Sequence, residues 1–482
     1  MRESDNSYYE EEAFKAALAA YENMVRSGSS AYFDADELTD IAEYYISKNL
    51  QKEAMACIQY ARSLHPQSVD PQIFIARQFL FEGALDKAQQ ICDSIPDTEH
   101  LEVIFLKAEI LIHRGYSDEA FSFLFKKYNS IHEHPALFLH DCIEICIDYN
   151  YNKQGLEWAV VLVANHPEYP PGRMLQADLL ILNGKYEEAQ ELLQKELEAD
   201  PYNQKAWLLM ADSQCALGEY HDALDSIEYA QAISQESEQA MLTKAHCLFH
   251  LNQMEEAHRQ YEHYLSVNPQ DDNALYQDGI CLANMERYEE AVQQLNKALV
   301  EDHTQSGLGT EICTQLAYTL SKLGQTDLAL AALDKGEELR TPDDKFEKEL
   351  LRGHVLLENG KQAEALKEFQ LAIEKSKTPN LTWITMAISM CESTFYEDAL
   401  DILEKIEPFL NPEQHALAVP YIAYANHQLE RWEKYLYYLP KAVAENRETA
   451  DFLFSPFYPG HIPDQFVECA HLQIYGTLPT SG

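Results

Sequence analysis

Apolar residues recur along most of the chain at positions i, i+3, i+4 and i+7, the spacing that brings side chains to one face of an α-helix. Each such run lasts roughly 12–14 residues before a turn residue interrupts it. This periodicity is helical and not strand-like. The hydrophobic pattern therefore predicts an all-α protein built from many short helices.

A small residue recurs in every second predicted helix, and three positions separate it from a bulky apolar residue. These anchors return at intervals of 32 to 38 residues, and they are Ala54, Ala88, Ala120, Gly155, Ala189, Ala223, Ala257, Ala291, Ala329, Ala365, Ala399 and Tyr435. In most units a second small residue stands twelve positions earlier, at Ala42, Ala76, Ala108, Ala177, Ala211, Ala245, Gly279, Ala317, Gly353, Ala387 and Ala423. Because a large side chain at a crossing would hold two helices apart, the paired small residues predict that the two helices of each unit cross closely.

A turn residue stands five positions before many anchors, at Gly83, Gly115, Gly184, Gly218, Gly324, Gly360, Asn49, Asn150 and Asn252. Glycine and asparagine suit the left-handed backbone that often ends a helix. Bulky residues such as Trp207, Met210, Ile227 and Leu295 are expected to fill the space beside the small ones. Each unit is thus predicted to be a helix, a tight turn and a second helix.

These units resemble the tetratricopeptide repeat. The best match has Trp207, Met210 and Ala211 in the first helix and Tyr220, Ala223, Ile227 and Ala230 after Gly218, and the unit before it closes with Pro201. The resemblance covers residues 35–447, about twelve units, and Gly155, Tyr435 and Glu196 depart from it by replacing an expected alanine. It implies an all-α, right-handed solenoid of stacked antiparallel helix pairs, of the kind found in bacterial cytoplasmic proteins.

The two ends of the chain lie outside the repeats. In residues 1–34, Tyr8–Ser27 is predicted to form a lone capping helix that packs through Ala13, Ala17 and Ala20. Residues 448–482 are rich in phenylalanine, tyrosine and proline. They could cap the apolar end of the solenoid, as terminal repeats require, or dock a partner. Within the array, residues 301–310 add about four residues and predict a softer junction.

The charge balance narrows the class of partner. The 36 basic residues face 80 acidic ones, which gives a formal net charge of −44, and the excess of acid is present in both halves of the chain. The charge therefore disfavours nucleic acids and anionic membranes as partners, since both need a basic surface. Part of the acid lies in pairs just before an anchor, at Glu11-Glu12, Asp118-Glu119, Glu187-Glu188, Glu255-Glu256, Glu289-Glu290 and Glu397-Asp398. Negative charge at these positions interacts favourably with the dipole of the second helix. A basic protein or peptide partner stays favoured.

The sequence also indicates the cellular compartment of the protein. Its longest apolar runs, such as Ala159–Ala164, are far shorter than the ~18–20 residues of a membrane span. The N-terminal residues lack the apolar core of a secretory signal. Ten widely spaced cysteines in such a chain are expected to be free thiols in a reducing compartment. A cytoplasmic protein is predicted.

Candidate chemistry is sparse. Cys142 and Cys146, with His132, His134 and His140 nearby, offer zinc ligands, but both cysteines fall on apolar repeat positions where small thiols fill a core. The pair Gly307 and Gly309 lacks the strand that a phosphate-binding loop needs. We find no other catalytic motif. No catalytic residue, metal or cofactor is predicted, and the chain is not expected to be an enzyme.

The resemblance implies a concave groove lined by first-helix residues, which are here Asp178, Lys205, Asp212, Gln239, His246, Phe249, Asn273, Tyr276, Tyr318, His354 and Tyr424. This polar and aromatic mixture suits peptide recognition. Family members that bind acidic chaperone tails use a carboxylate clamp of lysine and asparagine, whereas the corresponding positions here are Leu208, Asp212, Leu242, His246, Tyr276 and Ile280. No such clamp is expected.

Two functions follow from the resemblance. The first is a non-enzymatic scaffold or adaptor that binds a protein or peptide partner in the groove. The alternative is a regulatory subunit or peptide sensor that modulates an enzyme or a signalling protein. Sensors of similar architecture usually carry an N-terminal DNA-binding helix-turn-helix, for which residues 1–34 are too short and too acidic. The scaffold is therefore the favoured prediction.

Overall fold

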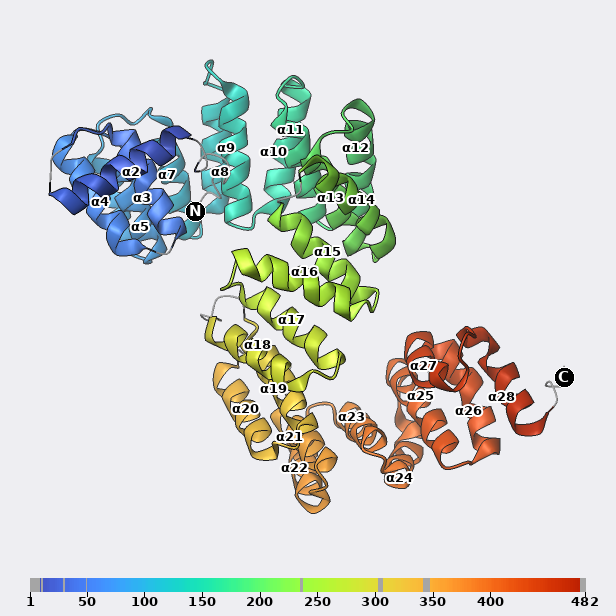
Figure 1. Ribbon diagram of the computed structural model, residues 1–482. Coiled ribbons are helices and arrows are strands. Elements are labelled where there is room, and N and C mark those ends of the chain that lie inside the picture. Colours follow the sequence, from blue (N-terminus) through green and yellow to red (C-terminus); the bar gives the residue numbers. More distant parts are fainter. Residues whose placement is uncertain are drawn as a thin grey trace. The chain divides into compact units, whose positions relative to one another are not determined.

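The computed structural model of the chain describes residues 9, 12–28, 31–48, 50–234, 237–301, 307–340 and 347–476. Throughout this part the regular structure is α-helix with a few short 3-10 helices (Figure 1). The chain divides into two units, Met1–Gln235 (unit 1) and Glu236–Gly482 (unit 2). Each unit is described by itself below.

The helices of both units form successive pairs. In unit 1 they are α2 (Glu12–Ser27), α3 (Ala35–Ser47), α4 (Gln51–Leu64), α5 (Asp70–Phe81), α6 (Leu85–Ser94), α7 (Leu101–His113), α8 (Ser117–Tyr128), α9 (Pro135–Asp148), α10 (Asn152–Asn165), α11 (Pro171–Leu182), α12 (Tyr186–Ala199), α13 (Gln204–Ala216) and α14 (Tyr220–Ile233). In unit 2 they are α15 (Glu238–His250), α16 (Met254–Val267), α17 (Asp272–Asn284), α18 (Tyr288–Glu301), α19 (Gly309–Lys322), α20 (Thr326–Leu339), α21 (Lys348–Glu358), α22 (Gln362–Lys375), α23 (Pro379–Glu392), α24 (Tyr396–Ile406), α25 (Pro412–Gln428), α26 (Trp432–Glu445), α27 (Arg447–Phe454) and α28 (Phe466–Tyr475). From α3 to α26 each odd-numbered helix packs on the even-numbered helix after it, so the predicted all-α solenoid of antiparallel helix pairs is confirmed.

The small residues lie where the two helices of a pair meet. The anchors and the second small residues are all buried. At two crossings there is no room for a side chain. A Cβ atom added to Gly353 would lie 2.4 Å from Cε1 of Phe369, and one added to Gly279 would lie 2.7 Å from Cδ2 of Leu295. The close crossing expected from the sequence is therefore confirmed.

The turns between paired helices have the left-handed backbone that was predicted. Gly83, Gly115, Gly184, Gly218, Gly324, Gly360, Asn150 and Asn252 all have positive φ, whereas Asn49 lies outside the described residues. The same turn position has a φ of 60° at Glu286, 69° at Thr394 and 54° at Glu430. The sequence analysis missed these three, because the backbone adopts the turn there without glycine or asparagine.

The N-terminal helix does not pack as predicted. Ala13 and Ala20 of α2 are exposed and Ala17 is only partly buried, while Phe14, Tyr21 and Met24 are buried. The helix is held through large side chains, such as Tyr21 against Phe33 with ring centroids 6.0 Å apart. The assignment of the three alanines as its packing residues was wrong.

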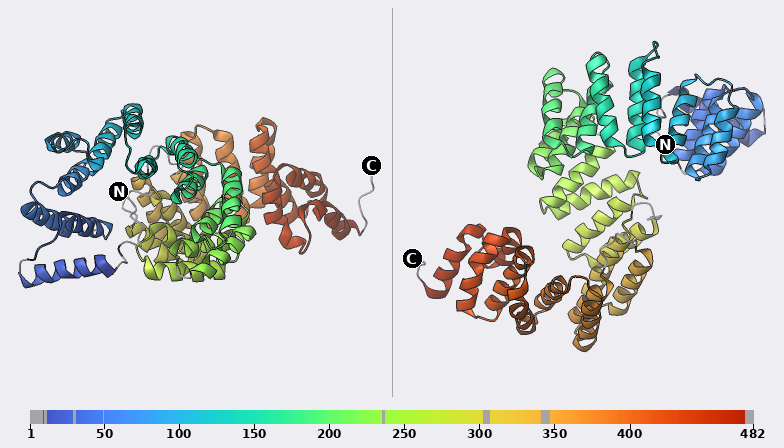
Figure 2. Two further views of the ribbon diagram at one scale, coloured as in Figure 1. Left: turned by 90° about the horizontal axis from the view of Figure 1, so that it is seen from above. Right: turned by 180° about the vertical axis from the view of Figure 1, so that it is seen from behind.

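The first helices of successive repeats form a layer of their own in each unit. In unit 1, α3, α5 and α7 pack in sequence, as do α9, α11 and α13; in unit 2, the helices from α17 to α25 with odd numbers do so. Among the described repeat helices, no two successive second helices pack on each other to a comparable extent. Figure 2 shows the pairs stacked side by side in two further views.

We use the name first-helix face for one surface of this layer. It carries the residue that follows the second small residue of each repeat, such as His246 after Ala245, the residue one helical turn before that position, such as Tyr276 before Ile280, and the last turn of each first helix. Side chains from neighbouring first helices meet on it.

The C-terminal segment folds back on the last repeat. Phe454 of α27 and Phe466 of α28 are fully buried, and the hydroxyl oxygen of Tyr458 lies 2.8 Å from that of Tyr435 on α26. In contrast, Phe452 remains 77% exposed. Both α27 and α28 pack on α26. Most of these aromatic side chains thus contribute to the core of the last pair.

Candidate functional site

In unit 1 the first-helix face carries a charged cluster around Arg77 of α5. Its guanidinium donates from Nε to Oε2 of Glu109 over 3.1 Å and from Nη2 to Oε1 over 3.0 Å. Nη2 also lies 2.9 Å from Oε2 of Glu102, which like Glu109 belongs to α7. Burial by itself would lower the pKa of Arg77, but Glu109 and Glu102 raise it. Two carboxylates face one guanidinium, so the cluster keeps a negative charge.

In unit 2 the face carries a chain of contacts across three first helices. The ring of Tyr318 on α19 meets the ring of His354 on α21 edge-on, with centroids 5.0 Å apart. Nδ1 of His354 lies 3.7 Å from Oε2 of Glu392, the last residue of α23. Burial lowers the pKa of His354. The imidazole is therefore neutral near pH 7.

The last turns of α19 and α21 are joined by ionic and hydrogen-bonding contacts. The carboxylate of Glu358 accepts from Nζ of Lys322 and from Oγ of Ser321. Nδ2 of Asn359 donates to Oγ of Ser321 over 2.7 Å. Burial would raise the pKa of Glu358, but the contacts with Lys322 and Ser321 lower it below its usual value. The charges of Glu358 and Lys322 therefore satisfy each other.

Aromatic side chains form the next part of the face toward the N-terminus of unit 2. Nε2 of His246 lies 3.1 Å from Nε2 of His250, and the ring of His250 contacts that of Phe249 at 5.4 Å between centroids. Tyr276 on α17 is half-buried, and burial raises the pKa of its hydroxyl. These rings offer aromatic surface that is still open to a ligand.

The residues predicted to line the groove divide between the units. Unit 1 contains Asp178, Lys205 and Asp212, and unit 2 contains Gln239, His246, Phe249, Asn273, Tyr276, Tyr318, His354 and Tyr424. Lys205, Gln239 and Asn273 are exposed, and most of the others are partly buried. His354 is only 8% exposed, because Tyr318 and the neighbouring helices cover it, so it offers little surface to a partner.

The sequence analysis missed five charged residues of the face, namely Arg77, Glu109, Lys322, Glu358 and Glu392. The repeat register held the signal, since Arg77 follows Ala76 just as His246 follows Ala245. Lys322, Glu358 and Glu392 likewise occupy one position, at the ends of three successive first helices. That these residues pair across repeats becomes visible only in the structure.

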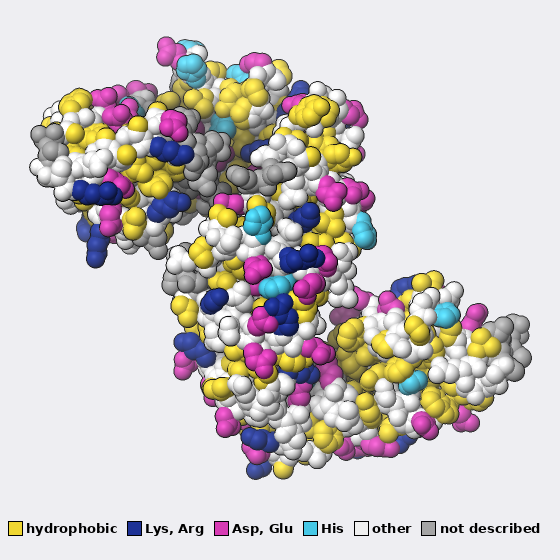
Figure 3. All heavy atoms as spheres, in the orientation of Figure 1, with side chains coloured by type: hydrophobic (Ala, Val, Ile, Leu, Met, Phe, Trp, Pro, Cys, Tyr) yellow, Lys and Arg dark blue, Asp and Glu magenta, His cyan; other side chains and the backbone are white. Residues whose placement is uncertain are grey.

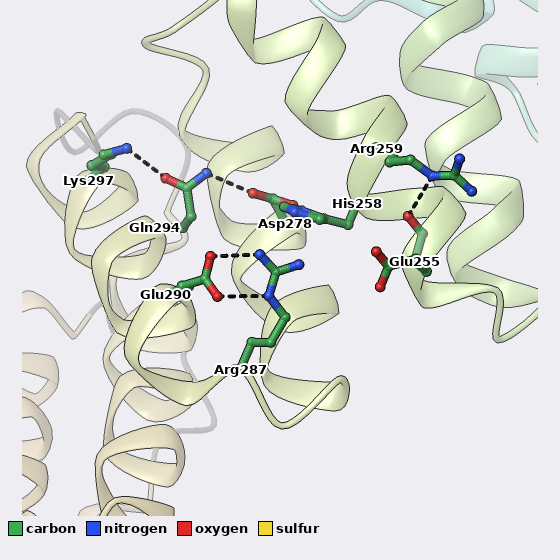
Figure 4. Close-up of polar contacts among 8 residues, drawn as sticks. All are labelled: Glu255, His258, Arg259, Asp278, Arg287, Glu290, Gln294 and Lys297. Carbon is green, nitrogen blue, oxygen red and sulfur yellow. Dashed lines mark hydrogen bonds and ion pairs between the residues drawn. The ribbon is translucent and has the colours of Figure 1, made fainter.

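A buried polar network links three helices below the face (Figure 4). Asp278 of α17 is fully buried; Nδ1 of His258 on α16 lies 2.5 Å from its Oδ1, and Nε2 of Gln294 on α18 donates to its Oδ2 over 2.7 Å. Lys297 in turn donates to Oε1 of Gln294 over 2.9 Å. The network thus joins the second helix of one repeat to both helices of the next.

Charge is mixed over the part of unit 2 that Figure 3 shows. Acidic, basic and histidine side chains alternate over α16 to α22 rather than forming a patch of one sign. Arg287 and Glu290, which Figure 4 labels, form one ion pair of this unit, with Nη2 and Oε2 2.6 Å apart. The net charge therefore acts on a partner at long range, whereas individual sites decide the contacts at close range.

A groove also opens on the second-helix side of unit 2. It has a volume of about 520 Å³ and runs between α22 and α24 over Trp383 and Met386 of α23. Leu366 and Ile402 line its walls, and Lys405 at its edge is paired with Asp401 at 2.7 Å. Its lining mixes apolar side chains with polar and charged ones, among them Gln362 and Asp398.

The candidate zinc ligands of the sequence have other roles. Cys142 and Cys146 are buried in the core of unit 1, and burial raises the pKa of both thiols, that of Cys146 to about 12. Nδ1 of His140 lies 2.9 Å from the hydroxyl of Tyr169. Among the described residues, no group of three or more histidine, cysteine or acidic side chains could hold a metal ion.

Gly309, of the glycine pair that the sequence analysis considered as a phosphate-binding loop, is the first residue of α19, while residues 302–306 lie outside the described part.

Comparisons with known proteins assign the repeats. The model described as anaphase-promoting complex, cyclosome, subunit 3 matches residues 148–230, and two tetratricopeptide repeat models match residues 242–306 and 310–342. No curated protein matches the chain significantly.

Several solved structures are similar in part. YrrB, described as a tetratricopeptide repeat protein with an unusual peptide-binding site, is 22% identical, with a TM-score of 0.33 over 39% of this chain and 94% of its own. MamA from Desulfovibrio magneticus RS-1 is 20% identical, with a TM-score of 0.33 over 35% of this chain and 93% of its own. A tetratricopeptide repeat protein from Parabacteroides merdae is 17% identical, with a TM-score of 0.38 over 53% of this chain and 98% of its own.

The stacked helix pairs and the shared first-helix face define a helical solenoid of the protein-interaction class. The repeat length, the buried small residues and the two tetratricopeptide repeat models that match residues 242–306 and 310–342 then identify the units of this chain as tetratricopeptide repeats. This repeat is generally a non-catalytic scaffold for protein–protein interaction. None of the helices that the structure describes combines the length and apolar character needed to cross a membrane.

Proposed function

We propose that the chain is a non-enzymatic scaffold that holds an extended segment of a protein partner along its first-helix face. One observation supports this most directly: four of the first helices of unit 2, α15, α17, α19 and α25, carry a partly open aromatic side chain, namely Phe249, Tyr276, Tyr318 and Tyr424. Aromatic rings at repeated intervals, flanked by polar groups, suit the recognition of a peptide.

The partner segment is proposed to be basic. The formal net charge of −44 repels acidic partners at long range, and locally the carboxylates of Glu102 and Glu109 outnumber the guanidinium of Arg77. The same excess of acid disfavours nucleic acids and anionic membranes as partners. A cytoplasmic location, suggested by the ten free cysteines, is part of the proposal.

We also propose a role for each of three segments of the chain. The repeats at 35–447 would bind the partner, residues 1–34 would cap one end, and residues 448–482 would cap the other. The buried Phe454 and Phe466 support the second cap, because they cover the apolar side of the last helix pair. The predicted softness of residues 301–310 stays a prediction, since residues 302–306 lie outside the described part.

A pair of double variants tests the proposal. Proteins captured from the native host by the full chain are identified and purified, and their affinity is then measured for the wild type and for Tyr276→Ala combined with His246→Ala. We expect a loss of about tenfold or more, because these rings lie on the first-helix face and interface aromatic residues often carry 1–2 kcal/mol or more.

The matched control is His263→Ala combined with Tyr437→Ala. Both residues are exposed on second helices, α16 and α26, and the change in side-chain type is the same. This control should bind like the wild type. Equal binding by all three proteins, or a loss confined to the control, would show that the partner does not use the first-helix face.

A further inference from the structure

Two histidines in the last turn of α15 bring their ring nitrogens together. His246 and His250 are the only histidines of the chain that are four positions apart, the spacing that makes side chains neighbours on a helix. Their Nε2 atoms lie 3.1 Å apart, and their ring centroids lie 4.4 Å apart. His250 is exposed and His246 is partly buried, so both rings reach the surface of the first-helix face.

The helix dipole does not explain this arrangement. A positively charged histidine stabilises the C-terminal end of a helix. A contact between two Nε2 atoms, however, requires a lone pair on one of them, so at least one of the two rings is neutral. Burial also lowers the pKa of His250, which keeps this ring neutral near pH 7. A neutral imidazole nitrogen is the form that binds a metal ion.

The separation of the two Nε2 atoms matches the distance that one metal ion spans. Zinc binds imidazole nitrogen at about 2.0–2.1 Å. An ion about 2.05 Å from each Nε2 atom would make an angle of about 98° with them at the observed 3.1 Å separation. This angle lies between the about 90° of square-planar or octahedral ions and the about 109° of tetrahedral ones. The pair is therefore spaced for two adjacent coordination positions.

We propose that His246 and His250 chelate one divalent transition-metal ion, such as Zn²⁺ or Ni²⁺, on the first-helix face. Imidazole suits these ions, whereas Mg²⁺ and Ca²⁺ prefer oxygen ligands. Two protein ligands leave the other positions to water, so the ion is exchangeable, in contrast to the closed structural sites that need more protein ligands. The inference requires no partner and is independent of the proposed function.

Equilibrium dialysis of the untagged full chain against NiCl₂ tests the chelate. The wild type is compared with His246→Gln, His250→Gln and the control His263→Gln, in which an exposed histidine of the second helix α16 undergoes the same change. We expect the wild type and the control to bind one Ni²⁺ ion at least tenfold more tightly than the other two proteins. In them, the second imidazole joins an ion that the first already holds, which makes its binding intramolecular. An excess of MgCl₂ should not compete.

Hydrogen exchange then shows where the ion binds. An ion held across one helical turn must leave before that turn opens, so exchange slows by the factor 1 + [Ni²⁺]/Kd. At a free Ni²⁺ concentration of 100 times Kd, peptides that cover residues 246–253 of the wild type should exchange about a hundredfold more slowly. Peptides from α25 should exchange as before, and His250→Gln should show no slowing at the same concentration.

The results decide the proposal without reference to a partner. A nickel affinity that His246→Gln or His250→Gln retains would overturn the chelate, and so would exchange in α15 that stays unchanged when the ion binds. A loss of affinity in His263→Gln equal to that of the other variants would also overturn it, because the ion would then not depend on this pair. None of these results changes the proposed function, which concerns a protein segment.

Discussion

Replacing Gly353 by alanine tests whether the close crossing of two paired helices requires a small residue. The new Cβ atom would lie 2.4, 2.5 and 2.8 Å from three ring atoms of Phe369, all well inside normal contact. Phe369 is fully buried on α22, so its ring has little room to move away. Helix propensity alone would make Gly353→Ala stabilising by about 1 kcal/mol. The clash costs about 1–3 kcal/mol by comparison with overpacked cores.

We expect a net loss of about 1–2 kcal/mol, confined to the neighbourhood of α21 and α22. Because a repeat array need not unfold as one unit, the assay is native-state hydrogen exchange of peptides from these helices rather than a single melting curve. Gly172 provides the control. A Cβ atom there would meet Leu162 and Val163 at ordinary distances of 3.4 Å and more, so Gly172→Ala should be neutral or stabilising.

A second variant separates clash from other effects. Phe369→Leu makes room for the added methyl group, so Gly353→Ala should cost less in that background than in the wild type. Higher protection of α21 in Gly353→Ala alone would refute the reasoning. It would mean that the glycine is tolerated at the crossing rather than required by it.

Two further predictions concern the turns and the C-terminal segment. Thr394 adopts a φ of 69°, which is strained for a β-branched residue. Thr394→Gly should therefore raise the free energy of unfolding of α23 and α24 by about 1 kcal/mol, whereas Thr394→Ala should not. An equal effect of the two variants in urea denaturation would argue against strain. Phe466 is fully buried, so Phe466→Ala should destabilise the last repeat by about 3–5 kcal/mol and speed hydrogen exchange in α26. If instead exchange stays unchanged and partner binding is lost, residues 448–482 dock a partner rather than cap the solenoid.

The repeat could be predicted because its physical cause is local and recurs. Two helices that cross closely need small residues at a fixed separation, and Ala211 and Ala223 show that separation as clearly as any pair in the chain. The N-terminal helix shows the limit of this logic. Alanine also occurs on exposed helix surfaces, and with one helix there was no repetition to distinguish Ala13 from the buried Phe14.

The turns and the site depended on information that residue identity does not carry. Glu286 and Thr394 adopt the same left-handed turn as the glycines, but neither residue type indicates it. On the first-helix face, what matters is which charges pair between residues more than thirty positions apart, such as Lys322 and Glu358. The register predicts that such residues lie on one face, whereas pairing and burial decide which remain available, as His354 illustrates.

The position of a bound partner tests the central claim most directly. A photo-reactive benzoylphenylalanine is placed at position 276 on the first-helix face or at position 437 on the second helix α26, and the chain is irradiated with its purified partner. Both sites carry a tyrosine in the wild type, so the replacement is conservative in each case. The account predicts a covalent adduct from position 276 and none from position 437. An adduct from position 437 alone would contradict it.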